Sequence, residues 1–320
     1  MAFYKKQFGL ISAAVILILL VLFRYLGIID DYYITIIDLV FINIILAVSL
    51  NLTIGFLGQL ALGNAGFMAI GAYTSAILTT YLKLPPILLF PVAVLCSGVL
   101  AVLSSLIVGI PSLRLKGDYL AIITLGFGEI IKNIITGLKI TGGARGYKGI
   151  MNYNTDFETN AYVNMIVLYL FAGLTVFVIS NFTKSRHGRV IKSIRDNEIA
   201  SEASGVNIMY YKLLGFSMSA FFAGVAGSLY AHHNGILAAN KFDFNYSIEM
   251  VIMVVLGGMG NIKGSIAAAI FLTFLPQLLS SFSDKRMLFY SILLIIVMLV
   301  KNKNYPFLKI DFYKKRLLGR

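Results

Sequence analysis

Charged residues and cysteine are both scarce in this sequence. Only 13% of its 320 residues are Asp, Glu, Lys or Arg, against roughly 25% in an average soluble domain. This scarcity excludes intrinsic disorder, which requires few apolar residues and a high density of charge. The single cysteine, Cys96, excludes a disulfide framework and a cysteine-based metal cluster.

Phosphate-binding and catalytic motifs are missing as well. The dipeptide Gly-Lys never occurs, so the chain cannot supply the G-x-x-x-x-G-K-[ST] loop of a Walker-type ATPase. We also find no zinc-protease motif and no G-x-S-x-G nucleophile elbow. We therefore expect a chain that is not an enzyme, holds no metal and needs no cofactor.

Apolar residues are what the sequence has in abundance. They make up 58% of the chain, and the mean hydropathy is +0.85. About 20 apolar residues are needed for a helix to cross a bilayer, and lipid forces every backbone amide to bond within its own segment. We predict an all-α polytopic membrane protein with about ten (8–10) transmembrane helices, some of them broken or re-entrant. The predicted spans are 8–29, 34–57, 60–82, 87–110, 119–138, 161–180, 212–231, 247–256, 265–280 and 287–300.

Basic residues divide unevenly between the loops that these spans leave. With the N-terminus inside, 18 of the 27 Lys and Arg residues fall on the cytoplasmic side and 8 on the outer side. This bias follows the positive-inside rule, so we expect one transmembrane domain over 1–320 with both termini cytoplasmic. We interpret the first run as a retained anchor and the basic tail 301–320 as lying beside anionic lipid. The net charge of +13 then needs no nucleic-acid partner.

Glycine is concentrated in two clusters, one in each half of the chain. Residues 55–71 hold five glycines together with Gln59 and Asn64, and residues 256–264 hold a second group with Asn261. Close helix packing is one interpretation. The other is a pair of broken helices around a substrate path, as in many transporters. Whether 60–82 crosses the membrane fully or re-enters stays open.

A carboxylate lies deep in one predicted span. Glu129 is ten residues into 119–138, about 15 Å from its start and near the midplane of the bilayer. A charge there costs about 2.5–3.5 kcal/mol on insertion scales. Because Lys132 and Asn133 share its helical face, Glu129 is either one partner of a structural ion pair or part of a polar wall of the path. The expected pathway residues are Gly58, Gln59, Gly63, Asn64, Gly66, Glu129, Gly257 and Gly258.

Other polar residues fall near the outer ends of the predicted spans. Asp38 and Glu249 lie where their side chains can reach the membrane interface. His232 and His233 fall in a predicted outer loop without a third histidine or a cysteine nearby. We expect both histidines to be surface residues rather than metal ligands.

The loop 181–211 is predicted to be cytoplasmic and partly helical. Residues 189–203 favour an amphipathic helix, with Lys192 and Asp196 paired four residues apart and Gly205 just after its end. Its short apolar stripe consists of Val190, Ile191 and Ile194. Such a helix can lie on lipid, but the acids Glu198 and Glu202 favour docking to a cytoplasmic protein.

Five stretches in this order resemble the membrane permease subunits of ABC importers for branched-chain amino acids, of the LivM type. The stretches are 55–73, 113–129, 141–150, 188–205 and 254–260. The sequence departs from the family at Ala61 and Asn64, where Ser and His are common. If those side chains touch the substrate, its identity stays open.

The resemblance implies a permease of the bacterial inner membrane that forms the pathway for leucine, isoleucine or valine. It also implies a second permease subunit, two cytoplasmic ABC ATPase subunits and an extracytoplasmic amino-acid-binding protein as partners, besides membrane lipid. Broken-helix amides near Gln59 and Asn64 would hold the carboxylate of the amino acid. The candidate ATPase contacts on the coupling helix are Arg195, Asp196, Glu198, Glu202 and Gly205.

Two rival interpretations remain at this stage. One is a permease of the same type for urea or another small polar solute. The other is an ion-coupled secondary transporter, with Glu129 as its proton site.

Overall fold

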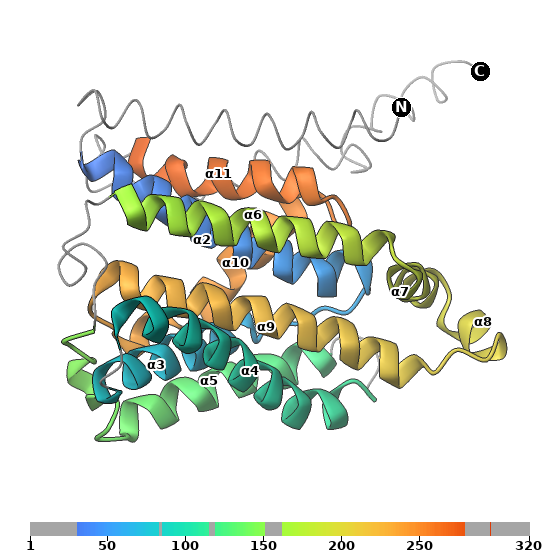
Figure 1. Ribbon diagram of the computed structural model, residues 1–320. Helices are drawn as coiled ribbons and strands as arrows, with labels where there is room; N and C mark the ends of the chain where they lie inside the picture. Colours follow the sequence, from blue (N-terminus) through green and yellow to red (C-terminus); the bar gives the residue numbers. More distant parts are fainter. Residues whose placement is uncertain (1–30, 83–84, 115–118, 151–161, 279–294, 296–320) are drawn as a thin grey trace, which may run out of the picture. The chain divides into compact units, whose positions relative to one another are not determined.

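The computed structural model describes residues 31–82, 85–114, 119–150, 162–278 and 295. Nearly all of these residues are helical, and pairing of strand type is limited to one isolated bridge between Tyr147 and Leu237. The predicted all-α class is therefore confirmed (Figure 1). The predicted span 8–29, most of 287–300 and the basic tail 301–320 lie outside the described residues.

The described helices follow the predicted spans within a few residues, because each apolar run bonds its backbone internally. A π-helix, η1 (Leu52–Phe56), continues α2, and short 3-10 turns, η2 (Gly143–Arg145) and η3 (Ala239–Lys241), lie between longer helices. The helices are α2 (Asp31–Asn51), α3 (Asn64–Tyr81), α4 (Pro86–Ser112), α5 (Tyr119–Gly137), α6 (Tyr162–Lys184), α7 (Arg186–Asp196), α8 (Glu198–Ala203), α9 (Ile208–Asn234), α10 (Phe244–Gly257) and α11 (Ile262–Leu278).

Five helical segments in the described part are long and apolar enough to cross a membrane. They are Tyr32–Phe56, Leu88–Ser112, Tyr119–Gly137, Asn164–Lys184 and Ile208–Asn234. Helix α10 has only 14 residues, or about 21 Å of helix, which is less than the roughly 30 Å hydrocarbon core. The polytopic character is confirmed, and the shortness of α10 agrees with the short predicted run 247–256.

Helix α9 forms the centre of the packing and contacts α2, α3 and α4. Its contact with α3 is close because glycines lie where the two backbones meet. A Cβ atom on Gly227 would lie 2.0 Å from the carbonyl oxygen of Met68, and one on Gly71 would lie 2.1 Å from that of Gly224. Helix packing therefore explains Gly71, at the end of the first glycine cluster.

Contacts within the chain separate two compact units, Met1–Ile270 and Phe271–Arg320. The packing and the sites described below belong to the first unit. The single transmembrane domain that we expect over 1–320 remains a prediction.

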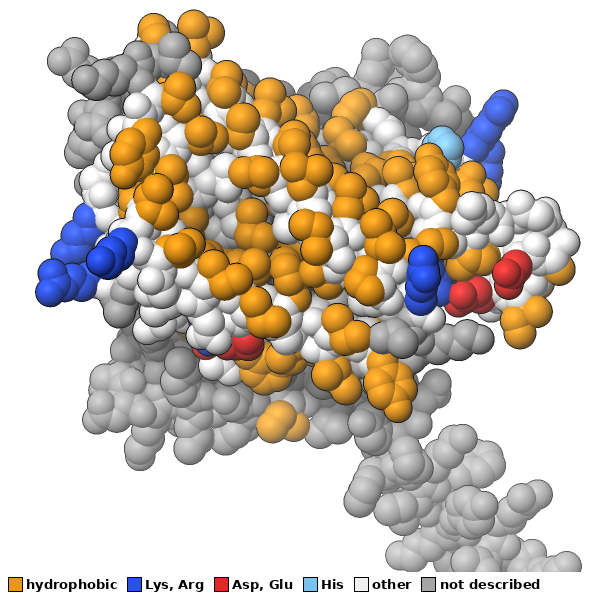
Figure 2. Space-filling model, turned by 90° about the horizontal axis from the view of Figure 1, so that it is seen from below, with side chains coloured by type: hydrophobic (Ala, Val, Ile, Leu, Met, Phe, Trp, Pro, Cys, Tyr) orange, Lys and Arg blue, Asp and Glu red, His pale blue; other side chains and the backbone are white. Residues whose placement is uncertain are grey.

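Helices α4 and α5 leave much of their apolar surface uncovered. Leu95, Ile107 and Ile122 are among the large hydrophobic side chains that they expose. Figure 2 shows hydrophobic side chains spread over one face of the molecule, with charged side chains mainly toward its two ends. Such an extensive apolar surface is typical of a protein covered by lipid or by another membrane subunit.

Candidate functional site

The first glycine cluster contains a break in the helix, as the second of the two interpretations predicted. The chain leaves η1 at Leu57 and becomes helical again only at Asn64. Gly58 has φ +74°, a left-handed conformation that glycine adopts readily. The main-chain amide of Gln59 donates back to the carbonyl of Thr53 at 3.0 Å, which closes the end of the helix.

The second glycine cluster forms the tight turn between α10 and α11. Gly258 has φ +95° and Gly260 has φ +79°, so both positions favour glycine. A Cβ atom on Gly257 would lie 2.4 Å from the main-chain nitrogen of Ser265. This turn brings the start of α11 directly against the end of α10.

The two glycine clusters meet through Asn51, the last residue of α2. Asn51 is fully buried; its Oδ1 accepts from the main-chain amide of Gly260 at 2.8 Å, and its Nδ2 donates to Ser265 Oγ at 2.9 Å. A Cβ atom on Gly55 would lie 2.2 Å from the nitrogen of Gly260. We call Asn51, Gly55, Gly58, Gly260 and Ser265 the glycine junction.

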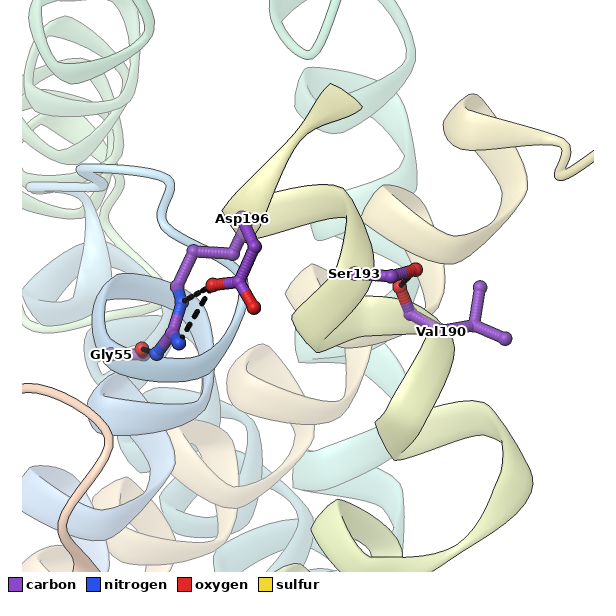
Figure 3. Close-up of polar contacts among 5 residues, drawn as sticks. Gly55, Val190, Ser193 and Asp196 are labelled. Atoms are coloured by element: carbon purple, nitrogen blue, oxygen red, sulfur yellow. Dashed lines mark hydrogen bonds and ion pairs between the residues drawn. The ribbon is translucent and has the colours of Figure 1, made fainter. Parts of the chain in front are cut away.

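Arg195, at the end of α7, reaches this junction from the loop that was predicted to be cytoplasmic. Its Nη1 donates to the carbonyl of Gly55 at 2.9 Å, and its Nε and Nη2 donate to Asp196 Oδ1 (Figure 3). A Cβ atom on Gly58 would lie 2.6 Å from Arg195 Cγ, so the stem of the arginine lies against that glycine. The last carbonyls of a helix lack partners within it, and a cation stabilises that end of the helix.

A second basic side chain of α7 also lies over the end of η1. The Nζ atom of Lys192 is 5.3 Å from the centre of the Phe56 ring. This position replaces the predicted pairing of Lys192 with Asp196, because Asp196 instead binds the guanidinium of Arg195. That prediction is wrong, and the contact of α7 with η1 explains why.

The single helix predicted over 189–203 is two helices, α7 and α8, so that prediction is also wrong. Asn197 separates them: its backbone is extended, and its side chain accepts from the amide of Ala200 as the N-cap of α8. Asparagine competes with the helix backbone in this way and favours a new start. Gly205 follows the end of α8 with φ +82°, as predicted for the residue after a helix end.

The two faces of α7 and α8 differ sharply in exposure. Ile191 and Ile194 of the predicted stripe are buried. Asp196 and Glu202 are exposed, and Ile199, which sequence analysis missed, is 79% exposed. The sequence signal for Ile199 is its large aliphatic side chain among the polar residues of a predicted exposed helix.

Glu198 is bound within the chain at the start of α8. Its Oε1 accepts from Lys212 Nζ at 2.7 Å, and the lysine side chain is almost completely buried. The pair lies on the wall of a cavity of about 730 Å³ between α8, the start of α9 and the end of α4, with Glu202 and Arg114 also lining it. This ion pair fixes α8 to α9.

The start of α3 packs closely against α5. A Cβ atom on Gly63 would lie 2.5 Å from the carbonyl oxygen of Thr124, and one on Gly66 would lie 2.9 Å from Gly128 Cα. Asn64 lies between these two glycines in the sequence. Its side chain is buried, and its Nδ2 has no hydrogen-bond partner. Gln59 is half-buried. Of the predicted pathway residues in the first cluster, Gly58 belongs to the glycine junction and Gly63, Asn64 and Gly66 lie at the start of α3, while Gln59 lies on the segment between them.

Glu129 forms an ion pair with Lys132 on α5, as the structural interpretation predicted. The glutamate side chain is 33% exposed and the lysine side chain 21% exposed. Asn133, the next polar residue, is also exposed. Partly or fully exposed polar groups therefore lie on an apolar helix, from its middle toward its C-terminal end.

The two histidines are buried, so the prediction that they are surface residues is wrong. Helix α9 continues to Asn234, beyond the predicted end at 231, and packs His232 and His233 against neighbouring helices. Asn164 Nδ2 lies 3.0 Å from Asp38 Oδ2 and 3.2 Å from His233 Nδ1. Asp38 is buried as well.

His232 belongs to a neighbouring buried contact. Its Nε2 lies 2.6 Å from Ser75 Oγ, which accepts from Ser228 Oγ at 2.8 Å. No cluster of three metal-ligating side chains occurs among the described residues. The polar groups at this end of α9 therefore connect helices to one another.

Comparison with known proteins gives one family. The family model described as the permease component of branched-chain amino acid transport systems matches residues 32–300. The high-affinity branched-chain amino acid transport permease protein LivM of Escherichia coli is 35% identical over 255 residues, which are 72% of this chain and 59% of that protein.

More distant relatives match shorter parts. The probable LivM permease of Methanocaldococcus jannaschii is 29% identical over 54% of this chain and 51% of its own length. The ribose import permease RbsC of Escherichia coli is 29% identical over 37% of this chain and 40% of its own length. The chain thus spans 59% of the length of the bacterial LivM proteins that it matches. No solved structure matches it significantly.

Proposed function

The chain belongs to the family of branched-chain amino acid transport permeases, and we propose that it forms the membrane pathway of an ATP-driven importer for leucine, isoleucine or valine. It is a multi-pass protein of the bacterial inner membrane, as its apolar helices and its relatives indicate. The proposed partners are a second permease subunit, two cytoplasmic ABC ATPase subunits and an extracytoplasmic amino-acid-binding protein.

The observation that carries this proposal is the connection of α7 to the glycine junction. Arg195 and Lys192 both contact η1, where the helix that precedes the break ends. An ATPase bound to α7 and α8 would act on the break directly.

The exposed side of α7 and α8 is the proposed ATPase-docking surface, which consists of Asp196, Ile199 and Glu202. Ile199 is an exposed apolar side chain between two exposed acids in the sequence, and protein interfaces combine an apolar core with a polar rim. Arg195 and Glu198, whose side chains are 37% and 39% exposed, support this surface through bonds within the chain. Gly205 supports it through the turn that ends α8.

The outer face of α5 is the proposed wall of the pathway. Facing lipid, the Glu129 and Lys132 charges would each cost about 2.5–3.5 kcal/mol or more near the midplane. A second permease subunit or a water-filled path would remove much of that cost. We therefore propose that this face, including Asn133, lines a water-filled path that the second permease subunit closes on its other side.

The break before α3 is the proposed place for the polar end of the amino acid. The first amides of a helix lack partners within it and attract an anionic carboxylate. The buried Nδ2 of Asn64 is a further donor at the start of α3. Gln59 lies on the same break. Gly58 lets the chain bend there, and Gly63 and Gly66 let α3 pack closely against α5. Gly257 and Gly258 shape the turn between α10 and α11.

Uptake by reconstituted importer tests the proposal. Proteoliposomes holding the chain and the four kinds of partner should accumulate leucine only with ATP, and unlabelled isoleucine and valine should compete where urea does not. Accumulation by the chain alone in a proton or sodium gradient would contradict the proposal and favour a secondary transporter. Competition by urea but not by isoleucine would favour the alternative substrate class.

Two substitutions test the substrate site itself. Gln59→Ala and Asn64→Ala should each lower leucine uptake while assembly with the ATPase stays intact. Unchanged uptake and unchanged coupling in both variants would remove these residues from the pathway.

A further inference from the structure

We infer that Arg195 is a positioning residue that transmits movement of α7 to the glycine junction, rather than a contact to the ATPase. The inference rests on the proposed function, since it concerns how an ATPase docked on α7 and α8 acts on the membrane helices. It assigns to Arg195 a bond within the chain that connects two elements 140 residues apart.

The contacts around Arg195 form one continuous series. Its Nη1 donates to Gly55, whose α-carbon lies so close to Gly260 that a Cβ atom would come within 2.2 Å of the Gly260 nitrogen. The amide of Gly260 in turn donates to Asn51, and Asn51 donates to Ser265 on α11. One guanidinium thus touches the end of η1 beside the turn that joins α10 to α11.

The orientation of Arg195 is fixed from two sides. Asp196 Oδ1 accepts from both Nε and Nη2, which leaves Nη1 directed to the Gly55 carbonyl (Figure 3). The stem of the arginine lies against Gly58, where a larger residue would displace it. A guanidinium has donors in a rigid planar fork, which allows it to hold two acceptors in one geometry.

The bond joins an anchored helix to a junction that contains glycines at positive φ. Helix α7 is anchored by its buried residues Ile191 and Ile194. The junction contains Gly58 and Gly260 at positive φ, and hinges are commonly a few residues that absorb changes in φ and ψ. A force on α7 would therefore reach the residues best able to change conformation.

The test compares ATP hydrolysis and leucine uptake in the same proteoliposomes of the complete importer. Arg195→Met keeps the stem against Gly58 and removes the guanidinium. Arg189→Ala is the matched control, since Arg189 is an exposed arginine on the same helix. We expect Arg195→Met to keep ATP hydrolysis while leucine taken up per ATP falls severalfold, because the guanidinium contact with Gly55 is lost. Arg189→Ala should keep the wild-type ratio.

Arg195→Lys provides a second variant if the methionine variant does not fold. It keeps the charge but lacks the planar fork, so its uptake per ATP should also fall below that of the wild type. A wild-type ratio in whichever variant folds overturns the inference. Loss of ATPase binding or of hydrolysis in Arg195→Met also overturns it, because that result would place Arg195 in the ATPase contact. Uptake by the wild-type importer that needs no ATP would instead overturn the proposed function, and this inference with it.

Discussion

Asn51 accepts a hydrogen bond from the main-chain amide of Gly260 at 2.8 Å, although the two residues are 209 positions apart in the sequence. The bond joins the end of α2 to the turn between α10 and α11. Because Asn51 also donates to Ser265, one buried amide holds both glycine clusters together. Side-chain and backbone contacts therefore define the conformation of the glycine junction seen in this structure.

Asn51→Ala should destabilise the protein markedly. The substitution leaves the partly buried amide of Gly260 without its acceptor and takes the amide donor away from the buried Ser265, and an unsatisfied buried polar group costs about 1–3 kcal/mol. Ser49→Ala is the control, because Ser49 is equally buried on α2 but bonds only to the carbonyl of Leu46 in its own helix. Thermal unfolding in detergent should show a larger fall for Asn51→Ala, and equal melting temperatures would contradict the assigned role.

Gly227→Ala should separate α9 from α3. Its new methyl group would lie 2.0 Å from the Met68 carbonyl oxygen, and such overpacking costs about 1–3 kcal/mol. Gly173→Ala on α6 is the matched control, since a Cβ atom there meets nothing within 4 Å. Thermal unfolding should show a loss only for Gly227→Ala. Similar losses in both variants would mean that helix packing does not require this glycine.

Asn164→Ala should weaken the contacts among α2, α6 and α9. The amide of Asn164 lies between Asp38 and His233, and a buried polar group deprived of its partner costs about 1–3 kcal/mol. Asn181→Ala, at an exposed position of the same helix, should leave the melting temperature nearly unchanged. A melting temperature for Asn164→Ala that matches the control would show that this polar contact adds no stability.

The helices could be predicted from the sequence because each is a local apolar run whose backbone must bond to itself in lipid. The predicted span 119–138 differs from α5 by one residue at its end. The break at Gly58 was one of two interpretations of the first glycine cluster, because local glycine content fits close helix packing as well as a break. The extension of α9 to His233 could not be predicted, because packing against other helices decides whether a polar end residue is buried.

The contacts that build the candidate site depend on residues far apart in the sequence. Nothing in the sequence near Asn51 or Ser265 indicates that their side chains bond to each other. Arg195 was expected to contact the ATPase, whereas its side chain donates to the carbonyl of Gly55. The division of 189–203 at Asn197 depends on one side chain that caps a new helix. Periodicity detects the apolar stripe on both sides of that division but not the interruption itself.

Asn133 should be accessible to water in the assembled importer. Cys96 is the only cysteine in the chain, so Cys96→Ser gives a background in which Asn133→Cys can be labelled alone. Leu103→Cys is the control, because position 103 is exposed on α4 and the proposal leaves it facing lipid. A membrane-impermeant thiol reagent should modify Asn133→Cys several times faster than Leu103→Cys, because the reaction needs a thiolate formed in water. Equal, slow labelling at both positions would contradict the proposed pathway along α5.

The central claim is that a separate ATPase docks on α7 and α8, and cross-linking from Ile199 tests it most directly. In the Cys96→Ser background, Ile199→Cys would carry a thiol-linked photo-cross-linker. Ile236→Cys is the control, since it is also exposed but follows the far end of α9, a helix of 27 residues and about 40 Å in length. In proteoliposomes that accumulate leucine with ATP, position 199 should form an adduct with the ATPase subunit and position 236 should not. An active importer that gives no adduct from position 199 would contradict the claim.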